Sequence, residues 1–158
     1  MTRRARLSKA DQELIAAATA AIKARYRNDW QEVGAALRTR SGKIFTGVNL
    51  DAYLGRMAVC AEAVALGRAV VDLGDAGIDT IVAVRHPPPD ETDQTIAVVS
   101  PCGACRELIF DYDAKAHVIV PNPLPSLPRK RGREGRAAAA VVPIADLLPN
   151  KYSRGPQT

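Results

Sequence analysis

The sequence predicts an α/β domain in which helices cover a mixed β-sheet. Segments with the spacing of amphipathic helices alternate with short runs rich in β-branched residues. The chain has 158 residues, of which 47% are hydrophobic. This length suits one compact domain with its own core and is short for two ordinary domains. We therefore expect a single domain over residues 1–158, with a core from about residue 8 to residue 152.

The first half of the chain predicts a helix followed by a hairpin. Residues 8–26 have apolar side chains at helical spacing, with Ser8 as a cap and Asp11 where a capping-box acid belongs. Residues 33–39 and 44–49 then predict two strands joined by a turn at 40–43. A second helix is expected from about Cys60 to Leu73, and its apolar surface nearly all round predicts that it is buried.

The second half predicts shorter elements separated by proline-rich connections. Its expected elements begin with a strand at 78–84, a loop at 86–94 and a strand end or partner strand at 95–99. A third helix follows through about Tyr112, with Pro101 just before it or at its start. The last expected elements are a strand at 117–120, a connection at 121–136, a strand at 138–143 and a helical turn at 144–148. The tail after Tyr152 is expected to be loose.

A basic segment at 129–136 contributes much of the formal net charge of +5. It holds five Lys and Arg residues against one acid, Glu134. Such a run fits either a solvated loop or a contact with phosphates of nucleic acid. The loop interpretation is favoured because the run contains no aromatic residue on which a base could stack. Nucleic acid is therefore an unlikely partner.

Hydropathy and cysteine content point to the inside of the cell. No apolar run approaches the roughly 20 residues needed to cross a bilayer, and the basic start, residues 1–7, leads into an amphipathic stretch. We expect a soluble cytoplasmic protein with no membrane partner. Three cysteines, a close pair and a distant third, favour metal binding or redox chemistry over a disulfide framework.

Two short segments carry the chemistry that the sequence predicts. They are Cys60-Ala61-Glu62 and the run from Pro101 to Cys105, in which Cys102 and Cys105 have C-x-x-C spacing. Each segment is expected to open a helix, where thiolates are stabilised. Zinc prefers four ligands, so three sulfurs leave one position for water and indicate a catalytic site. Glu62 would then lie beside that water and move its proton.

With these motifs the chain resembles the cytidine deaminase family. C-x-E followed at a distance by P-C-x-x-C matches the deaminase signature, with Cys60 in place of a histidine. Further segments resemble family motifs: residues 33–37 (VGAAL), 45–51 (FTGVNLD), 100–106 (SPCGACR) and 147–152 (LLPNKY). The resemblance extends from about Leu14 to Tyr152. It implies a three-layer α/β/α fold with a five-stranded mixed sheet.

The resemblance also implies a role for individual residues. Cys60, Cys102 and Cys105 would hold zinc, and Glu62 would be the catalytic proton shuttle. The expected substrate contacts are the backbone at Ala61 and Ser100, the side chain of Asn49 on a sugar hydroxyl, Asp51 on the sugar, and Tyr152, which would reach the site of a neighbouring subunit. The implied protein is a homotetrameric enzyme of pyrimidine salvage that deaminates a small nucleoside such as cytidine or deoxycytidine.

Several positions depart from the family pattern and leave the substrate open. Asp51 replaces a longer Glu, Gln31-Glu32 replaces the usual F-P, and Glu107 replaces a common Gln. Because specificity depends on polar groups that pair with the substrate, these changes favour a modified sugar pocket. Deamination of blasticidin S or another modified aminopyrimidine is therefore the alternative to cytidine.

The same residues also allow interpretations without catalysis. The cysteines could be buried thiols or hold a structural zinc, although a fourth protein ligand is not evident. His86 and His117 are expected not to be ligands, and Arg56 and Arg106 could bond to sulfur. Polynucleotide editing is disfavoured because such editors generally use histidine where this chain has Cys60, and a silent scaffold is disfavoured by the presence of Glu62.

Overall fold

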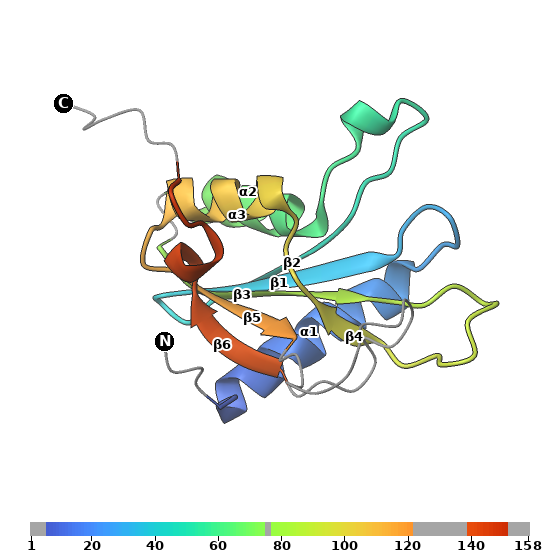
Figure 1. Cartoon of the computed structure of the whole chain (residues 1–158), viewed down its shortest axis with the longest axis horizontal. Helices are drawn as coiled ribbons and strands as arrows, with labels where there is room; N and C mark the ends of the chain where they lie inside the picture. Colours follow the sequence, from blue (N-terminus) through green and yellow to red (C-terminus); the bar gives the residue numbers. More distant parts are fainter. Residues whose placement is uncertain (1–5, 75–76, 122–138, 152–158) are drawn as a thin grey trace.

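The computed structural model describes residues 6–74, 77–121 and 139–151, and its elements form three layers. Three helices are present in these ranges: α1 (Lys9–Arg25), α2 (Ala61–Leu73) and α3 (Gly103–Tyr112). The strands are β1 (Val33–Thr39), β2 (Ile44–Val48), β3 (Ile78–Arg85), β4 (Ala97–Val99), β5 (His117–Pro121) and β6 (Ala139–Pro143). Short 3₁₀ turns lie at Gly55–Met57 and Ile144–Leu147. In Figure 1, α2 and α3 cover one face of the sheet and α1 covers the other.

The sheet is mixed, as the sequence predicts. Its continuous order is β2-β1-β3-β5-β6, in which β3 and β5 are parallel and the other neighbours are antiparallel. The short strand β4 is a sixth member, antiparallel to the end of β3 at residues 83–85. Because β1 occupies the whole opposite edge of β3, β4 and β5 share one edge of that strand, and the chain from β4 leads directly into α3.

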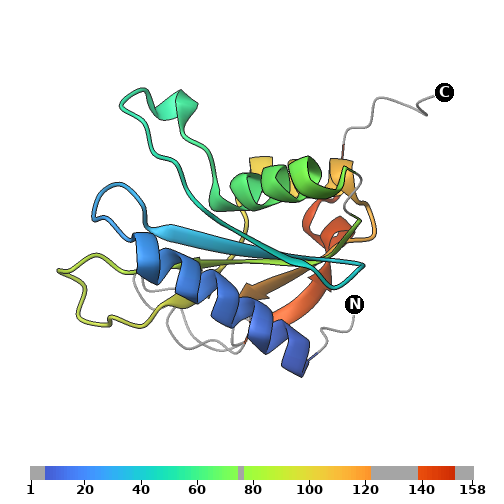
Figure 2. The ribbon, with the colours of Figure 1, turned by 180° about the vertical axis from the view of Figure 1, so that it is seen from behind.

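Alternating side chains of the strands build two cores, one on each face. Ala36, Val82 and Ile119 pack with Leu14 and Ile22 of α1. Their immediate neighbours along the strands face α2 and α3; this larger core includes Ala35, Leu37, Ile81, Ala83, Val118, Ala65 and Ile109. Burial of successive residues on opposite faces is the two-residue period of a β-strand covered on both sides. Figure 2 shows α1 running across the sheet on the face opposite α2.

Two glycines allow the helices to approach the sheet closely. A Cβ at Gly34 in β1 would lie 2.6 Å from the Ala18 carbonyl oxygen of α1. A Cβ at Gly47 in β2 would lie 2.6 Å from both the Ala61 carbonyl oxygen and the Ala65 nitrogen of α2. These contacts are with backbone atoms, which cannot rotate away, so any side chain at Gly47 would displace the first turn of α2.

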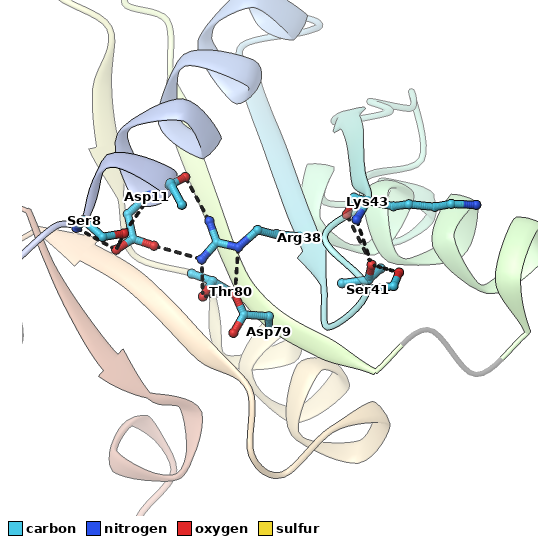
Figure 3. A network of polar contacts seen from close by, with 9 residues as sticks. Ser8, Asp11, Arg38, Ser41, Lys43, Asp79 and Thr80 are labelled. Atoms are coloured by element: carbon cyan, nitrogen blue, oxygen red, sulfur yellow. Dashed lines mark hydrogen bonds and ion pairs between the residues drawn. The ribbon is translucent and has the colours of Figure 1, made fainter.

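A polar network fastens the start of α1 to the sheet (Figure 3). Arg38 of β1 donates to Asp11 Oδ1 at 3.1 Å, to Asp79 Oδ2 at 2.7 Å and to the Ala10 carbonyl oxygen at 2.8 Å. Burial acts to raise the pKa of Asp11, but hydrogen bonds from Ser8 and the Arg38 guanidinium hold it below its usual value. Ser8 and Asp11 also form the capping box that the sequence predicts. The buried carboxylate is thus fully paired, as burial of a charge requires.

Element boundaries differ from the sequence-based expectation mainly where helices begin. The second and third helices begin at Ala61 and Gly103, because Cys60 and Cys102 are extended N-cap residues and not the first helical ones. The strand expected at 95–99 is shorter and is a partner of β3. The basic segment at 129–136 and Tyr152 lie outside the described residues. Within the described ranges, no helix combines the length and the apolar character needed to span a membrane.

Candidate metal centre

Three thiols converge where α2 and α3 begin. Cys60 caps α2, Cys102 caps α3, and Cys105 lies in the first turn of α3. The Sγ atoms of the three cysteines all lie within 4.8 Å of one another, and those of Cys60 and Cys102 are 3.7 Å apart. The structure therefore brings together the three cysteines that the sequence singles out, although 42 residues separate Cys60 from Cys102.

Local backbone geometry explains why the C-x-x-C spacing works. The extended conformation of Cys102 turns its side chain back over the helix start, where Cys102 Sγ accepts a hydrogen bond from the Cys105 N–H at 3.4 Å. Burial acts to raise the pKa of Cys102, but this hydrogen bond and those of the neighbouring thiols bring it below its usual value. A helix N-terminus favours a negative sulfur in the same way.

The spacing of the sulfurs fits zinc. Four ligands arranged tetrahedrally at a Zn–S distance of about 2.3 Å lie about 3.8 Å apart. The 3.7 Å between Cys60 Sγ and Cys102 Sγ matches that edge. Three protein sulfurs leave a fourth position, and Cys102 is exposed whereas Cys105 is buried, so the cluster is open to solvent on the Cys102 side. Such a three-thiol site suits a catalytic metal with an open position.

Glu62 is a buried carboxylate in the first turn of α2, only 6% exposed. Burial raises the pKa of this carboxyl above its usual value, which keeps its protonated and ionised forms closer in energy near neutral pH. Burial, together with the nearby Glu62 charge, also raises the pKa of Cys60 and Cys105. Without a metal, these two cysteines therefore favour the neutral thiol. A coordinated divalent cation reverses this preference, since a thiol bound to a metal is deprotonated.

The residues that the sequence analysis expects to contact the substrate differ in their exposure and hydrogen bonding. Ala61 is buried at the first position of α2, and Ser100 is exposed between β4 and Pro101. The amide of Asn49 is engaged within the chain: its oxygen accepts from the N–H groups of Glu32 and Val33, and its nitrogen donates to the Trp30 carbonyl oxygen. Asp51 is exposed and accepts from the Ala52 N–H. Asn49 thus anchors the entry to β1.

An exposed arm, residues 50–59, connects β2 to Cys60 and projects from the domain (Figure 1). Its base is closed by two backbone hydrogen bonds between Leu50 and Val59. Most of its large apolar side chains are exposed: Leu50, Tyr53, Leu54, Met57 and Val59. Trp30 meets Tyr53 with ring centroids 5.3 Å apart, so the arm is braced against the segment that Asn49 holds. This apolar arm was not singled out from the sequence.

The histidines and arginines that the sequence analysis considered near the metal site make other contacts in the structure. Arg106 donates to the carbonyl oxygens of Pro101 and Leu147, and so supports the loop that carries Cys102. His86 stacks on Tyr26 with ring centroids 3.8 Å apart, and His117 lies exposed at the start of β5. Among the described residues, the group of three or more possible metal ligands consists of Cys60, Cys102 and Cys105. Arg56 is exposed in the 3₁₀ turn of the arm.

Comparison with known families identifies this arrangement of thiols and acid. The family model described as the cytidine and deoxycytidylate deaminase zinc-binding region matches residues 8–120, most of the chain. The chain belongs to this deaminase family. The match spans both cysteine segments and Glu62, and the three-thiol cluster is positioned to hold a metal ion, as a zinc-binding deaminase domain requires.

Individual relatives agree with this assignment. The deaminase is 44% identical over 148 residues to blasticidin-S deaminase of Bacillus cereus, covering 94% of this chain and 96% of that protein. It is 36% identical to cytidine deaminase of Sporosarcina psychrophila over 80 residues, about half of each chain. The crystal structure of cytidine deaminase from Burkholderia pseudomallei superimposes with a TM-score of 0.63 at 27% identity, covering 92% of this chain and 100% of that one. The α/β/α fold expected from the sequence is therefore confirmed.

Proposed function

We propose that the protein deaminates an aminopyrimidine nucleoside by hydrolysis, with Glu62 as the proton carrier and Cys60, Cys102 and Cys105 as the zinc ligands. One observation carries this proposal: a buried carboxylate follows Cys60 by two residues on a helix start where three thiols meet. Zinc, when bound, lowers the pKa of water toward neutrality and so supplies the nucleophile. A carboxyl of raised pKa suits a group that must both take and give a proton.

Glu62 has three tasks in this reaction. It takes a proton from the attacking water, gives a proton to the ring nitrogen, and then transfers a proton to the departing amine. The net change replaces the C–NH₂ group of the base by C=O, consumes one water and releases one ammonia. The backbone at Ala61, directly after Cys60, and at Ser100, two residues before Cys102, would hold the base beside the Glu62 carboxyl. Such positioning accelerates a reaction without a chemical step of its own.

Blasticidin S is the substrate that the chain supports best. The relative that shares 44% identity over nearly its full length is a blasticidin-S deaminase. Gln31 lies just before β1, where the family resemblance implies an aromatic residue. A polar amide there, together with the short Asp51, suits a base whose sugar differs from ribose, because a pocket is specific through the polar groups it pairs.

Cytidine is the second candidate, and Asn49 favours it. Asn49 lies eleven residues before Cys60 at the position that resembles the family's sugar-binding asparagine. Three of the hydrogen-bonding capacities of its amide are used within the chain, and its second N–H donor is left for a sugar hydroxyl. With this substrate the enzyme would act in pyrimidine salvage. Its three thiols favour a reducing compartment, which supports a cytoplasmic location.

Ammonia release by the zinc-loaded protein tests the proposal. Blasticidin S, cytidine, deoxycytidine and free cytosine would be compared at equal concentration. We expect the highest kcat/KM with blasticidin S, a lower value with the two nucleosides and no release from cytosine, which lacks a sugar. Preference for cytidine would transfer the assignment to the second candidate. Ammonia release from none of the four would contradict the proposed substrate class.

We also propose that the protein assembles as a homotetramer in which Tyr152 reaches the site of a neighbouring subunit. The apolar arm supports an assembly, because five large apolar side chains gathered on one exposed loop are typical of an interface. The arm leads directly into Cys60, so an interface there would lie next to the metal centre. Light scattering on the same preparation is expected to give four times the 16.9 kDa mass of the chain; a monomeric mass would contradict this.

A further inference from the structure

Cys102 is the member of the thiol cluster that packing of the domain restrains least. It is exposed, whereas Cys60 is half-buried and Cys105 is buried. A metal ligand must nevertheless hold one orientation, because a site binds its ion tightly only when the ligands are oriented before the ion arrives. Contacts of the backbone around Cys102 therefore have to supply the restraint that burial supplies for Cys105.

Arg106 holds the peptide groups on both sides of Cys102. Its Nε donates to the Pro101 carbonyl oxygen at 3.0 Å, and its backbone N–H donates to the Cys102 carbonyl oxygen, also at 3.0 Å. The first carbonyl precedes the Cys102 Cα and the second follows it, so the two hydrogen bonds restrain the φ of −65° and the ψ of 169°. In this extended conformation, Cys102 Sγ accepts the hydrogen bond from the Cys105 N–H.

The guanidinium of Arg106 is itself attached to the core. Arg106 is half-buried, and its Nη1 donates to the Leu147 carbonyl oxygen at 3.4 Å. Leu147 packs against the larger core, and Ile144, in the same 3₁₀ turn, is fully buried. A planar guanidinium can bond two acceptors at once in a fixed geometry, which an ammonium on a flexible stem cannot do. The side chain of Arg106 thus joins the loop before Cys102 to a fixed part of the domain.

Cys60 shows what the side chain of this arginine replaces. Cys60 caps α2 as Cys102 caps α3, and its carbonyl oxygen accepts from the Val64 N–H at 3.2 Å. The preceding carbonyl, that of Val59, accepts from the Leu50 N–H at 2.9 Å. Both peptide groups that flank Cys60 are therefore held by backbone alone, through the closed base of the arm. At Cys102 the carbonyl before the cysteine is held by a side chain instead.

We propose that Arg106 is a positioning residue for the metal centre: by holding the Pro101 carbonyl oxygen, its guanidinium fixes the backbone of Cys102 and directs the Cys102 sulfur toward the metal. This role deepens the proposed function and rests on the proposed zinc ligation by Cys102. It does not depend on which aminopyrimidine is the substrate, so zinc binding alone can test it.

Zinc affinity separates positioning from a purely structural tie. A structural tie stabilises the metal-free and the zinc-loaded protein equally, and its loss leaves the Kd for zinc unchanged, because a ligand stabilises a protein only according to its affinity for the folded state. Loss of a group that orients a metal ligand typically weakens metal binding by 10- to 100-fold. Arg106→Met keeps an apolar stem but has no donor, so we expect its Kd for zinc to rise by about tenfold or more.

The experiment measures the Kd for zinc of four proteins by competition with a chromophoric chelator, together with the free energy of unfolding of each metal-free form. The proteins are the wild type, Arg106→Met, Arg106→Lys and Arg68→Met. Arg68 is the matched control, because it also lies on a helix and donates to a backbone carbonyl oxygen, that of Thr46 at 2.6 Å. We expect a wild-type Kd in Arg68→Met. Arg106→Lys keeps the charge without the planar fork, so it should recover only part of the affinity.

Each result bears on the role of Arg106. A wild-type Kd for zinc in Arg106→Met, with lowered stability of the metal-free form, would reduce Arg106 to a structural tie. Full recovery in Arg106→Lys would also overturn the inference, since charge and not the fixed fork would then matter; this variant alone decides if metal-free Arg106→Met does not fold. An equal rise in Arg68→Met would trace the effect to general loosening. A wild type without stoichiometric zinc would refute the proposed ligand set itself, and this role with it.

Discussion

Replacing Glu62 by Gln is expected to remove nearly all turnover while leaving the zinc site intact. The amide has the shape of the carboxyl but cannot accept and return a proton. Loss of general acid–base catalysis reduces rates by about 100- to 10,000-fold, and the effect should lie at the upper end because Glu62 handles several proton transfers. Burial raises the pKa of Glu62, so a neutral side chain is readily accommodated and stability should not fall. The measurement is kcat for ammonia release, alongside zinc content per chain.

Glu13→Gln provides the matched control for this variant. Glu13 is an exposed acid on α1, on the opposite side of the sheet from the thiols, and it carries the same chemical change. Its kcat should equal that of the wild type. Wild-type activity in Glu62→Gln would remove Glu62 from the mechanism, whereas loss of zinc from that variant would assign Glu62 to the metal site instead of to proton transfer.

Replacing Cys102 by Ala is expected to release the zinc and to lower the stability of the whole domain. Two sulfurs would remain, and a metal that binds only the folded state stabilises it by about 4 kcal/mol at a thousandfold excess over Kd. For a chain of this size that corresponds to a fall in melting temperature of roughly 10 °C. Zinc content and thermal unfolding, followed with and without a chelator, check both effects.

Chelation separates loss of metal from loss of a side chain. The wild type should lose about as much melting temperature in chelator as the variant has lost already, and Cys102→Ala should not respond further. Ser100→Ala is the neighbouring control, because its proposed contact uses the backbone and its side chain is exposed. Stoichiometric zinc in Cys102→Ala would contradict the assignment of Cys102 as a ligand.

The parts of the fold that follow local rules could be predicted from the sequence. The capping box of Ser8 and Asp11 and the hairpin turn at 40–43 depend on neighbouring residues, and both are present. The spacing of Cys102 and Cys105 reports a helix start in the same local way. Cys60 joins them because its own motif is specific, although nothing local indicates that it approaches them.

The features that the sequence did not reveal depend on contacts between distant segments. Arg38 joins Asp11 and Asp79, which lie 27 and 41 residues away, and no local pattern links the three. Lys151 meets Glu107 and Asp111 by the same kind of distant contact, although the spacing of the two acids on one helix face is a signal that could have been noted. The exposed apolar arm resembles an ordinary loop in the sequence, and only the structure shows that its large apolar side chains remain exposed.

X-ray absorption at the zinc edge of the wild-type protein tests the central claim most directly, because it counts and identifies the ligands of the metal. The account predicts three sulfur atoms at about 2.3 Å and one oxygen at about 2.0 Å, the open catalytic geometry. The oxygen should persist in Glu62→Gln, since the carboxyl is not a ligand. Four sulfurs, or a nitrogen in place of a sulfur, would contradict the three-cysteine catalytic site.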